Sequence, residues 1–223
     1  HDHISDFEHP TIEDYISSKA LLFQRCKHGV FNMDDKNYNN MIKNATCDIY
    51  TFGYNKEANV YIKNVELIRD KKSIGIDMEL ANDINDVIRV NTPGKFSSYN
   101  ASCAISVCHL LGIDVEDMKK ALVDFSVKGR VEPVSVLDGV TFIIDYAHNG
   151  VAMESILTTM REYNPKRLIT IFGCGGNRSK ERRYEMGEVS GRLADFSIVT
   201  SDNPRFEEPE AIINDILSTL TKT

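Results

Sequence analysis

The chain has 223 residues, enough for one large domain or two of modest size. Its 26 Lys and Arg against 33 Asp and Glu leave a formal net charge of −7, which excludes a general polyanion binder, so any phosphate site has to be local. Hydrophobic residues make up 42% and charged residues 26%, which excludes wholesale disorder, and no apolar run approaches the roughly 18 residues of a membrane span.

The first half of the chain combines helices with short strands. Thr11, with the acidic Asp14 three residues later, is typical of a helix N-cap and predicts a helix to about Cys26. Asp114 predicts a second capped helix, to about Phe125. Between them, apolar patterning predicts strands over 29–33, 48–54 and within 58–90, then a helix over 98–111.

The second half alternates regularly between strands and helices. Apolar runs predict strands over 140–145, 167–172 and 196–200, and helical periodicity predicts helices over 150–163, 180–194 and 208–220. This βαβαβα order predicts a parallel sheet with helices on both faces. We therefore expect an α/β fold that ends in a Rossmann-like domain.

Polar and glycine-rich segments follow all three of these expected strands, at 145–148, 173–178 and 201–205. In open α/β sheets, ligands bind beyond the carboxyl ends of the strands. Turn chemistry explains any single segment, but three at one edge indicate a site.

The glycine segment differs from the dinucleotide fingerprint G-x-G-x-x-G, because Arg178 occupies the third glycine position. Nearby cations supply local positive charge for an anionic ligand, namely Arg178, Lys180, Arg182 and Arg183. The alternative is a solvated helix face, which Glu181 within the run supports. The sequence contains no G-x-x-x-x-G-K-[ST], so this chain alone is not expected to cradle a triphosphate.

Lys19 falls at the centre of an apolar stripe on the first expected helix. At 100° per residue the stripe comprises Ile12, Tyr15, Ile16, Leu22, Phe23 and Cys26. Such a lysine either extends its ammonium to water, which is the commoner case, or is buried with its charge compensated. A buried amine has its pKa lowered by about 3–5 units and can react with carbon dioxide. The resulting carbamate could ligate a hard cation such as magnesium.

Several segments together resemble the Mur ligase family, and within it the tripeptide synthetases. They lie at 2–6, 13–23, 94–101, 129–132, 145–148, 172–176 and 202–205. The last three read DYAH, FGCGG and DNPR, each at the end of an expected strand, and they carry the resemblance most specifically. Five positions depart from the usual pattern: Lys95, Asn149, Gly150, Asn177 and Ser179. The spacing from His3 to Lys19 is also about two residues longer than usual.

The resemblance implies ATP-dependent amide formation in peptidoglycan synthesis, with ATP and Mg²⁺ as cofactors. ATP would phosphorylate the carboxylate of a UDP-linked muramoyl dipeptide, and an incoming amino group would attack the acyl phosphate. The DNPR form is associated with meso-diaminopimelate as that diamino acid. The guanidinium of Arg205 can form a bidentate pair with the distal carboxylate of diaminopimelate. The structural alternative is that Arg205 only caps the loop.

The resemblance also assigns roles to residues of this chain. His3 would bind metal and Lys19 would become carbamylated, both serving catalysis. The nucleotide would be held by Asn100, Arg130 and Asp145, with His148 close to it. The incoming amino acid would be held by Arg178, Asp202, Asn203 and Arg205.

The resemblance divides the chain into 1–129, the later part of a central ATPase domain, and 130–223, a truncated C-terminal domain. The absence of an initiator Met agrees with a fragment that is inactive by itself. Five cysteines without a CxxC pair, and a polar start without a signal peptide, favour a cytoplasmic protein. We expect a monomer without nucleic-acid or membrane partners.

Two alternatives remain open. A folylpolyglutamate-synthase or cyanophycin-synthetase relative shares the ATPase domain but should lack DNPR. A non-catalytic nucleotide-binding module is favoured by these departures from the family pattern.

Overall fold

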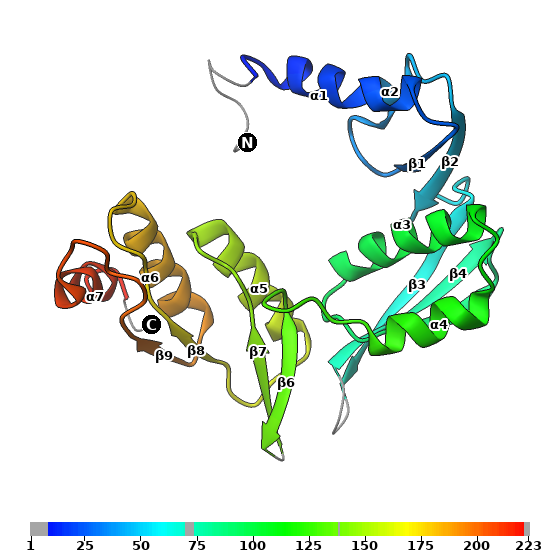
Figure 1. Ribbon diagram of the computed structural model, residues 1–223. Coiled ribbons are helices and arrows are strands. Elements are labelled where there is room, and N and C mark those ends of the chain that lie inside the picture. Colours follow the sequence, from blue (N-terminus) through cyan, green and yellow to red (C-terminus); the bar gives the residue numbers. More distant parts are fainter. Residues whose placement is uncertain (1–8, 70–73, 138, 221–223) are drawn as a thin grey trace. The chain divides into compact units, whose positions relative to one another are not determined.

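A computed structural model describes residues 9–69, 74–137 and 139–220 (Figure 1). The chain forms two compact units. Unit 1 comprises residues 1–66, 75–91 and 95–125, and unit 2 comprises 67–74, 92–94 and 126–223. Unit 2 thus includes two short segments from the first half of the sequence.

Unit 1 is built on a five-stranded sheet in the order β1-β2-β3-β4-β5. The strands are β1 His28–Asn32, β2 Asp48–Gly53, β3 Val60–Arg69, β4 Ile74–Asn82 and β5 Asp86–Val90. β2 pairs in parallel with both β1 and β3, whereas β4 and β5 are antiparallel. The core lies where alternate apolar residues of β3 and β4 are buried, as the period of two along a strand requires.

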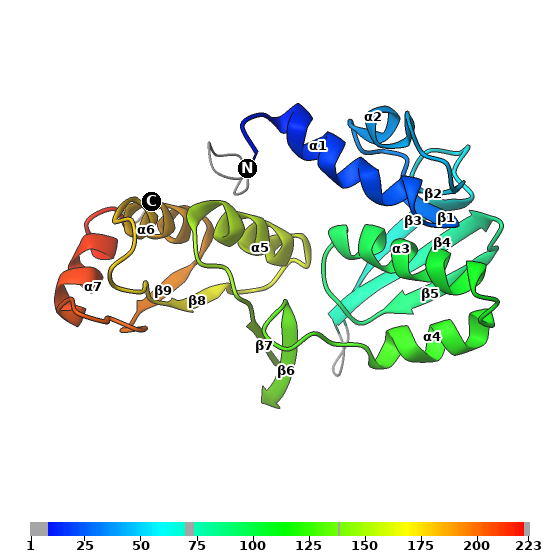
Figure 2. The ribbon, with the colours of Figure 1, turned by 45° about the horizontal axis from the view of Figure 1, so that its top comes forward.

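The helices of unit 1 are α1 Ile12–Ala20, α2 Tyr38–Ile42, α3 Phe96–Leu110 and α4 Val115–Asp124. α3 packs against β1, β2 and β5, and α4 packs against β5 (Figure 2). Both predicted caps are confirmed, since the Thr11 hydroxyl accepts from the Asp14 N–H and the Asp114 carboxylate from the Glu116 N–H. The first helix is shorter than predicted, because α1 ends at Ala20 and a 3₁₀ turn over Leu21–Gln24 follows.

Unit 2 contains β6 Glu132–Leu137, β7 Val140–Ile144, β8 Ile169–Phe172 and β9 Phe196–Val199. Its helices are α5 Gly150–Glu162, α6 Glu181–Leu193 and α7 Pro209–Leu217. β8 and β9 are parallel, and apolar side chains of the three helices and of both strands form one core cluster. From β7 onward the predicted order of strands and helices is confirmed, whereas β6 was not predicted.

The predicted α/β fold is confirmed, but the parallel pairing predicted for this half is found only between β8 and β9. β7 pairs antiparallel with β6, while β8 and β9 form a separate two-stranded sheet. β6 lies only two residues before β7 in the chain, so pairing the two strands costs little loop-closure entropy. Gly139, between these strands, has a left-handed φ of 77°. One face of the β8–β9 pair also stays open, with Ile171 63% exposed.

Asn149 and Gly150, which depart from the family pattern, have a local structural role at the start of α5. The Asn149 side chain accepts a hydrogen bond of 2.8 Å from the Ala152 N–H and so caps the helix. A Cβ on Gly150 would lie 2.7 Å from the Cβ of Glu185, so glycine permits α5 to approach α6. Both residues therefore have a structural role at the start of α5.

Within the described residues, every helix is too short or too polar to serve as a membrane span.

Candidate functional site

Asp145 joins two backbone segments at the end of β7. Its Oδ2 accepts from the Val131 N–H at 2.8 Å and its Oδ1 accepts from the Ala147 N–H at 2.8 Å. Val131 has a left-handed φ of 46°, rare for a β-branched residue, so this turn is held by its contacts rather than by its own preference. Asp145 thereby fixes the turn that carries Arg130 beside the segment that carries His148.

Tyr146 connects these two predicted nucleotide residues. The Arg130 guanidinium lies over the Tyr146 ring, 5.1 Å from its centroid, and the Tyr146 and His148 rings meet edge to face at 5.5 Å. Tyr146 is 65% exposed, so its ring remains accessible to a ligand. An exposed ring beside a guanidinium can stack on a base and attract a phosphate. Sequence reasoning did not single out Tyr146, although it lies within DYAH.

The glycine segment and the DNPR segment are joined directly. The Gly176 N–H donates to the Asn203 carbonyl oxygen at 2.9 Å, and Arg205 Nη1 donates to the Gly176 carbonyl oxygen at 2.7 Å. A Cβ on Gly176 would lie 1.9 Å from the Pro204 carbonyl oxygen, so a side chain has no room there. The structure therefore brings Asn203 and Arg205 to the glycine loop, as the strand-end argument predicts.

Exposed polar side chains surround this junction. Arg178, Asp202, Asn203 and Arg205 are all exposed, and Arg178 directly follows Asn177, whose Oδ1 accepts from the Phe206 N–H. Arg205 donates one of its five N–H groups to the loop, which leaves the guanidinium able to form a bidentate pair with a carboxylate. The capping role and the binding role of Arg205 are thus compatible.

Arg183 does not belong to the cationic face that the sequence suggested. Its side chain is buried, with Nη2 donating to both Glu207 oxygens at 2.8 Å and Nη1 to Asp215 Oδ2 at 2.8 Å. The pKa of Glu207 is lowered, first by the Asn177 N–H and then by Arg183, and Arg183 likewise lowers the pKa of Asp215. Arg183 is buried because its side chain points from α6 toward Asp215 of α7 and not toward solvent.

Asn100 lies exposed in the first half of α3 in unit 1, beside a network centred on Asp34. Asp34 accepts from the backbone N–H groups of Tyr54 and Asn55, at 2.6 and 3.1 Å, and from the Tyr99 hydroxyl at 3.1 Å. Burial, and then the charge of Asp34, raise the pKa of Tyr99 to about 12. The network attaches the loop after β2 to the residue directly before Asn100.

Lys19 is exposed, and α1 has no buried residue, so a lysine buried in an apolar stripe is not found. The 3₁₀ turn breaks the 100° periodicity after Ala20, and Leu21 and Leu22 are exposed. The Lys19 ammonium lies 4.8 Å from the centroid of the Tyr15 ring. Carbamylation of Lys19 therefore depends on the resemblance alone.

His3 lies outside the described residues. Among the residues that the structure does describe, no three His, Cys, Asp or Glu side chains gather as a metal site would require. The metal-binding roles of His3 and Lys19 stay predictions.

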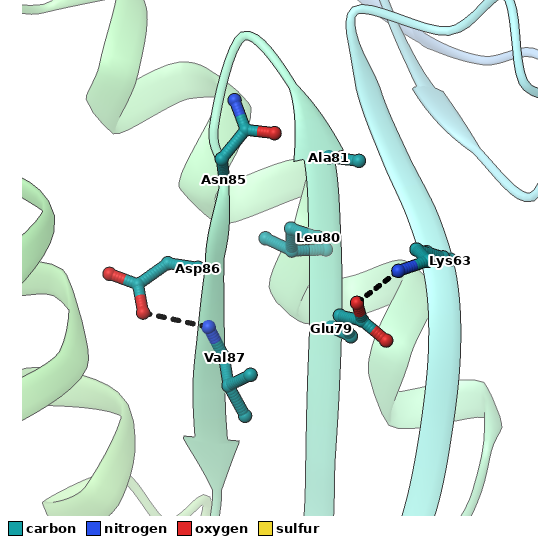
Figure 3. A pocket seen from close by; sticks show the side chains of 7 residues that line it. All are labelled: Lys63, Glu79, Leu80, Ala81, Asn85, Asp86 and Val87. Carbon is teal, nitrogen blue, oxygen red and sulfur yellow. Dashed lines mark hydrogen bonds and ion pairs between the residues drawn. The ribbon is translucent and has the colours of Figure 1, made fainter.

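A pocket over β3, β4 and β5 is lined by none of the predicted site residues that the structure describes. Figure 3 shows its lining: Lys63, Glu79, Leu80, Ala81, Asn85, Asp86 and Val87. The Lys63 ammonium is hydrogen-bonded to Glu79, so these charges are already paired. The pocket is therefore not our candidate site.

Two profiles of one family match the chain. The Mur ligase middle domain matches residues 1–108, and the Mur ligase glutamate ligase domain matches residues 129–222.

Similar curated proteins are named UDP-N-acetylmuramoyl-L-alanyl-D-glutamate–2,6-diaminopimelate ligase. The one from Clostridium botulinum is 39% identical over 219 residues, which cover 97% of this chain and 44% of that protein. The one from Caldanaerobacter subterraneus is 39% identical over 223 residues, which cover 100% of this chain and 45% of that protein. The chain thus spans less than half the length of these relatives.

Solved structures agree in fold. A structure of a UDP-N-acetylmuramoyl-L-alanyl-D-glutamate–2,6-diaminopimelate ligase is 28% identical with a TM-score of 0.69, covering 95% of this chain and 45% of that one. The folylpolyglutamate synthase of Thermotoga maritima, at 17% identity and a TM-score of 0.72, covers 96% of this chain and 50% of its own and shares the fold. With two domain profiles that together span most of its length, the chain belongs to the Mur ligase family, as a middle domain followed by a glutamate ligase domain.

Proposed function

We propose that the whole protein is an ATP-dependent ligase of peptidoglycan synthesis that joins meso-diaminopimelate to UDP-N-acetylmuramoyl-L-alanyl-D-glutamate. The observation that carries this proposal is the junction of the glycine and DNPR loops, where Arg205 is held by the Gly176 carbonyl oxygen. The names of relatives that match at least 97% of this chain at about 39% identity support the same substrates.

The exposed groups at the junction complement a diamino acid with two carboxylates. The Arg205 guanidinium can bind the distal carboxylate bidentately, and Arg178 adds a second cation. Asp202 and Asn203 supply oxygen acceptors for an ammonium group. Lysine has an ammonium and no carboxylate at its distal end, so the Arg205 cation would repel it.

In unit 2, Arg130 and Asp145 would contact the nucleotide, with His148 and the Tyr146 ring close to it. In unit 1, Asn100 keeps the adenine-binding role that the family resemblance implies. The Tyr146 ring and the Arg130 guanidinium can bind a base and a phosphate of the nucleotide. The described residues form no metal site, so the ligands that we propose for Mg²⁺ are His3 and carbamylated Lys19. ATP supplies the phosphoryl group that converts the dipeptide carboxylate to an acyl phosphate. ADP is released in this step. The amino group then attacks the acyl phosphate, so that an amide forms and inorganic phosphate and a proton leave.

We further propose that the first domain ends at residue 129 and the second begins at residue 130. We also propose that the whole protein is cytoplasmic and monomeric. This chain alone is expected to be inactive, because its sequence lacks the glycine-rich lysine loop that holds the β and γ phosphates.

The test is ADP release by the purified whole protein. Release that requires both the UDP-linked dipeptide and diaminopimelate, and that lysine does not support, is expected. Release that depends on a folate and glutamate would favour the folylpolyglutamate alternative. Nucleotide binding without turnover under any of these conditions would favour the non-catalytic module.

A further inference from the structure

Glu207 occupies a bridging position between the glycine loop and helix α6. Its Oε1 accepts from the Asn177 N–H at 2.6 Å, and both of its oxygens accept from Arg183 Nη2 at 2.8 Å. Glu207 lies two residues after Arg205, and Asn177 directly precedes Arg178. Glu207, which follows the DNPR loop in the chain, thus links that loop to the glycine loop and to α6.

Arg183 provides the fixed end of this bridge. It is 1% exposed, and its second partner is Asp215 on α7, at 2.8 Å from Nη1. A buried guanidinium keeps its carboxylate partners closely placed, because leaving it unpaired is strongly unfavourable. The position of Glu207 is therefore set by the core of unit 2 rather than by the exposed loops.

The loops themselves have strained backbone that needs such support. Asn177 and Arg205 both have a left-handed φ of 53°. Such conformations persist when surrounding contacts determine them. Besides the Glu207 contact, the Asn177 side chain accepts from the Phe206 N–H at 3.2 Å.

We propose that Glu207 is a positioning residue of the amino-acid site, which transmits the fixed position of Arg183 to Arg178 and Arg205 before the diamino acid binds. This inference rests on the proposed function. Preorganised cations lose less conformational entropy on binding, so the affinity for the diamino acid should depend on Glu207. Glu207 itself need not touch substrate.

Asp215 offers a matched control, because its carboxylate also accepts a hydrogen bond from Arg183 but, unlike that of Glu207, accepts none from the described residues of the glycine loop. Glu207→Gln and Asp215→Asn each remove one charge partner of Arg183 and preserve side-chain shape. Both should lower the melting temperature by similar amounts. Only Glu207→Gln should raise the KM for diaminopimelate, by roughly tenfold, with kcat and the KM for ATP within about twofold of the unmutated whole protein.

A third variant separates positioning from stability. Glu207→Asp keeps a charge for Arg183 but is one methylene too short to reach the Asn177 N–H as well. It should raise the KM for diaminopimelate while losing little stability. Equal KM changes in the Glu207 and Asp215 variants, or an unchanged KM in both Glu207 variants, would overturn the inference. An unmutated protein without diaminopimelate-dependent ADP release would instead overturn the proposed function, and this inference with it.

Discussion

Arg205 Nη1 and the Gly176 carbonyl oxygen lie 2.7 Å apart, so the arginine of DNPR is bound to the glycine loop. This hydrogen bond orients the Arg205 guanidinium and leaves its remaining N–H groups for a ligand. Binding and capping by this arginine can be separated by substitution.

Arg205→Ala should raise the KM of the whole protein for diaminopimelate by about ten- to a hundredfold, since a charge-assisted hydrogen bond contributes about 1.5–3 kcal/mol. The KM for ATP should hardly change. Arg205→Lys should recover only part of the affinity, because an ammonium cannot form a bidentate pair. Equal losses for both substrates in steady-state kinetics would point to a structural arginine.

Gly176→Ala should destabilise unit 2. Its Cβ would lie 1.9 Å from the Pro204 carbonyl oxygen, so backbone must move, at a cost of about 1–3 kcal/mol. Gly175→Ala is the control, because its Cβ would be 3.6 Å from the Asn203 carbonyl oxygen, an ordinary contact. Thermal unfolding of this chain measures both. A Gly176 variant as stable as the Gly175 variant would contradict the close packing of the two loops.

Acid should weaken unit 2 through Glu207, Asp215 and Asp195, because the pKa of each is lowered in the folded state. A lowered folded pKa contributes stability above the unfolded value, near 4 for carboxylates, and that stability is lost as pH falls through the folded pKa. The melting temperature should therefore be nearly constant from pH 7 to about 5 and fall below about 4. In the Glu207→Gln variant, the melting temperature should fall less steeply with pH below about pH 4. An unchanged slope would show that the ionisation of Glu207 is not coupled to folding.

Tyr146→Ala should raise the KM of the whole protein for ATP, by about fivefold if the ring contributes about 1 kcal/mol. Tyr146→Phe keeps the ring under Arg130 and should behave like the unmutated protein. The KM for diaminopimelate should be unchanged in both. An alanine variant with normal ATP kinetics would exclude this ring from the nucleotide site.

Lys19→Ala should abolish most activity of the whole protein if the family lysine is carbamylated. Acetate should then restore part of the activity, because its carboxylate can stand in for the carbamate. Rates are compared at fixed bicarbonate, with and without acetate. Full activity of the variant without acetate would refute the role.

Local patterns predicted the strands and helices of the second half from β7 onward and the caps at Thr11 and Asp114, because hydrophobic period and capping depend on residues close together in the chain. The preceding strand β6 was not predicted. The sequence by itself also determined the family, since DYAH, FGCGG and DNPR are contiguous motifs.

Only the tertiary structure decided which groups meet. The partner of β7 and the burial of Arg183 were not predicted, because each depends on an element distant in sequence. For Lys19 the sequence left exposure and burial open, and the change of helix type after Ala20 accompanies its exposure. Glu207 reads as an ordinary exposed acid until the fold places it between Asn177 and Arg183, 30 and 24 residues away in the chain. Patterns within a segment fix its own conformation, whereas long-range pairing of charges is set by how the segments pack.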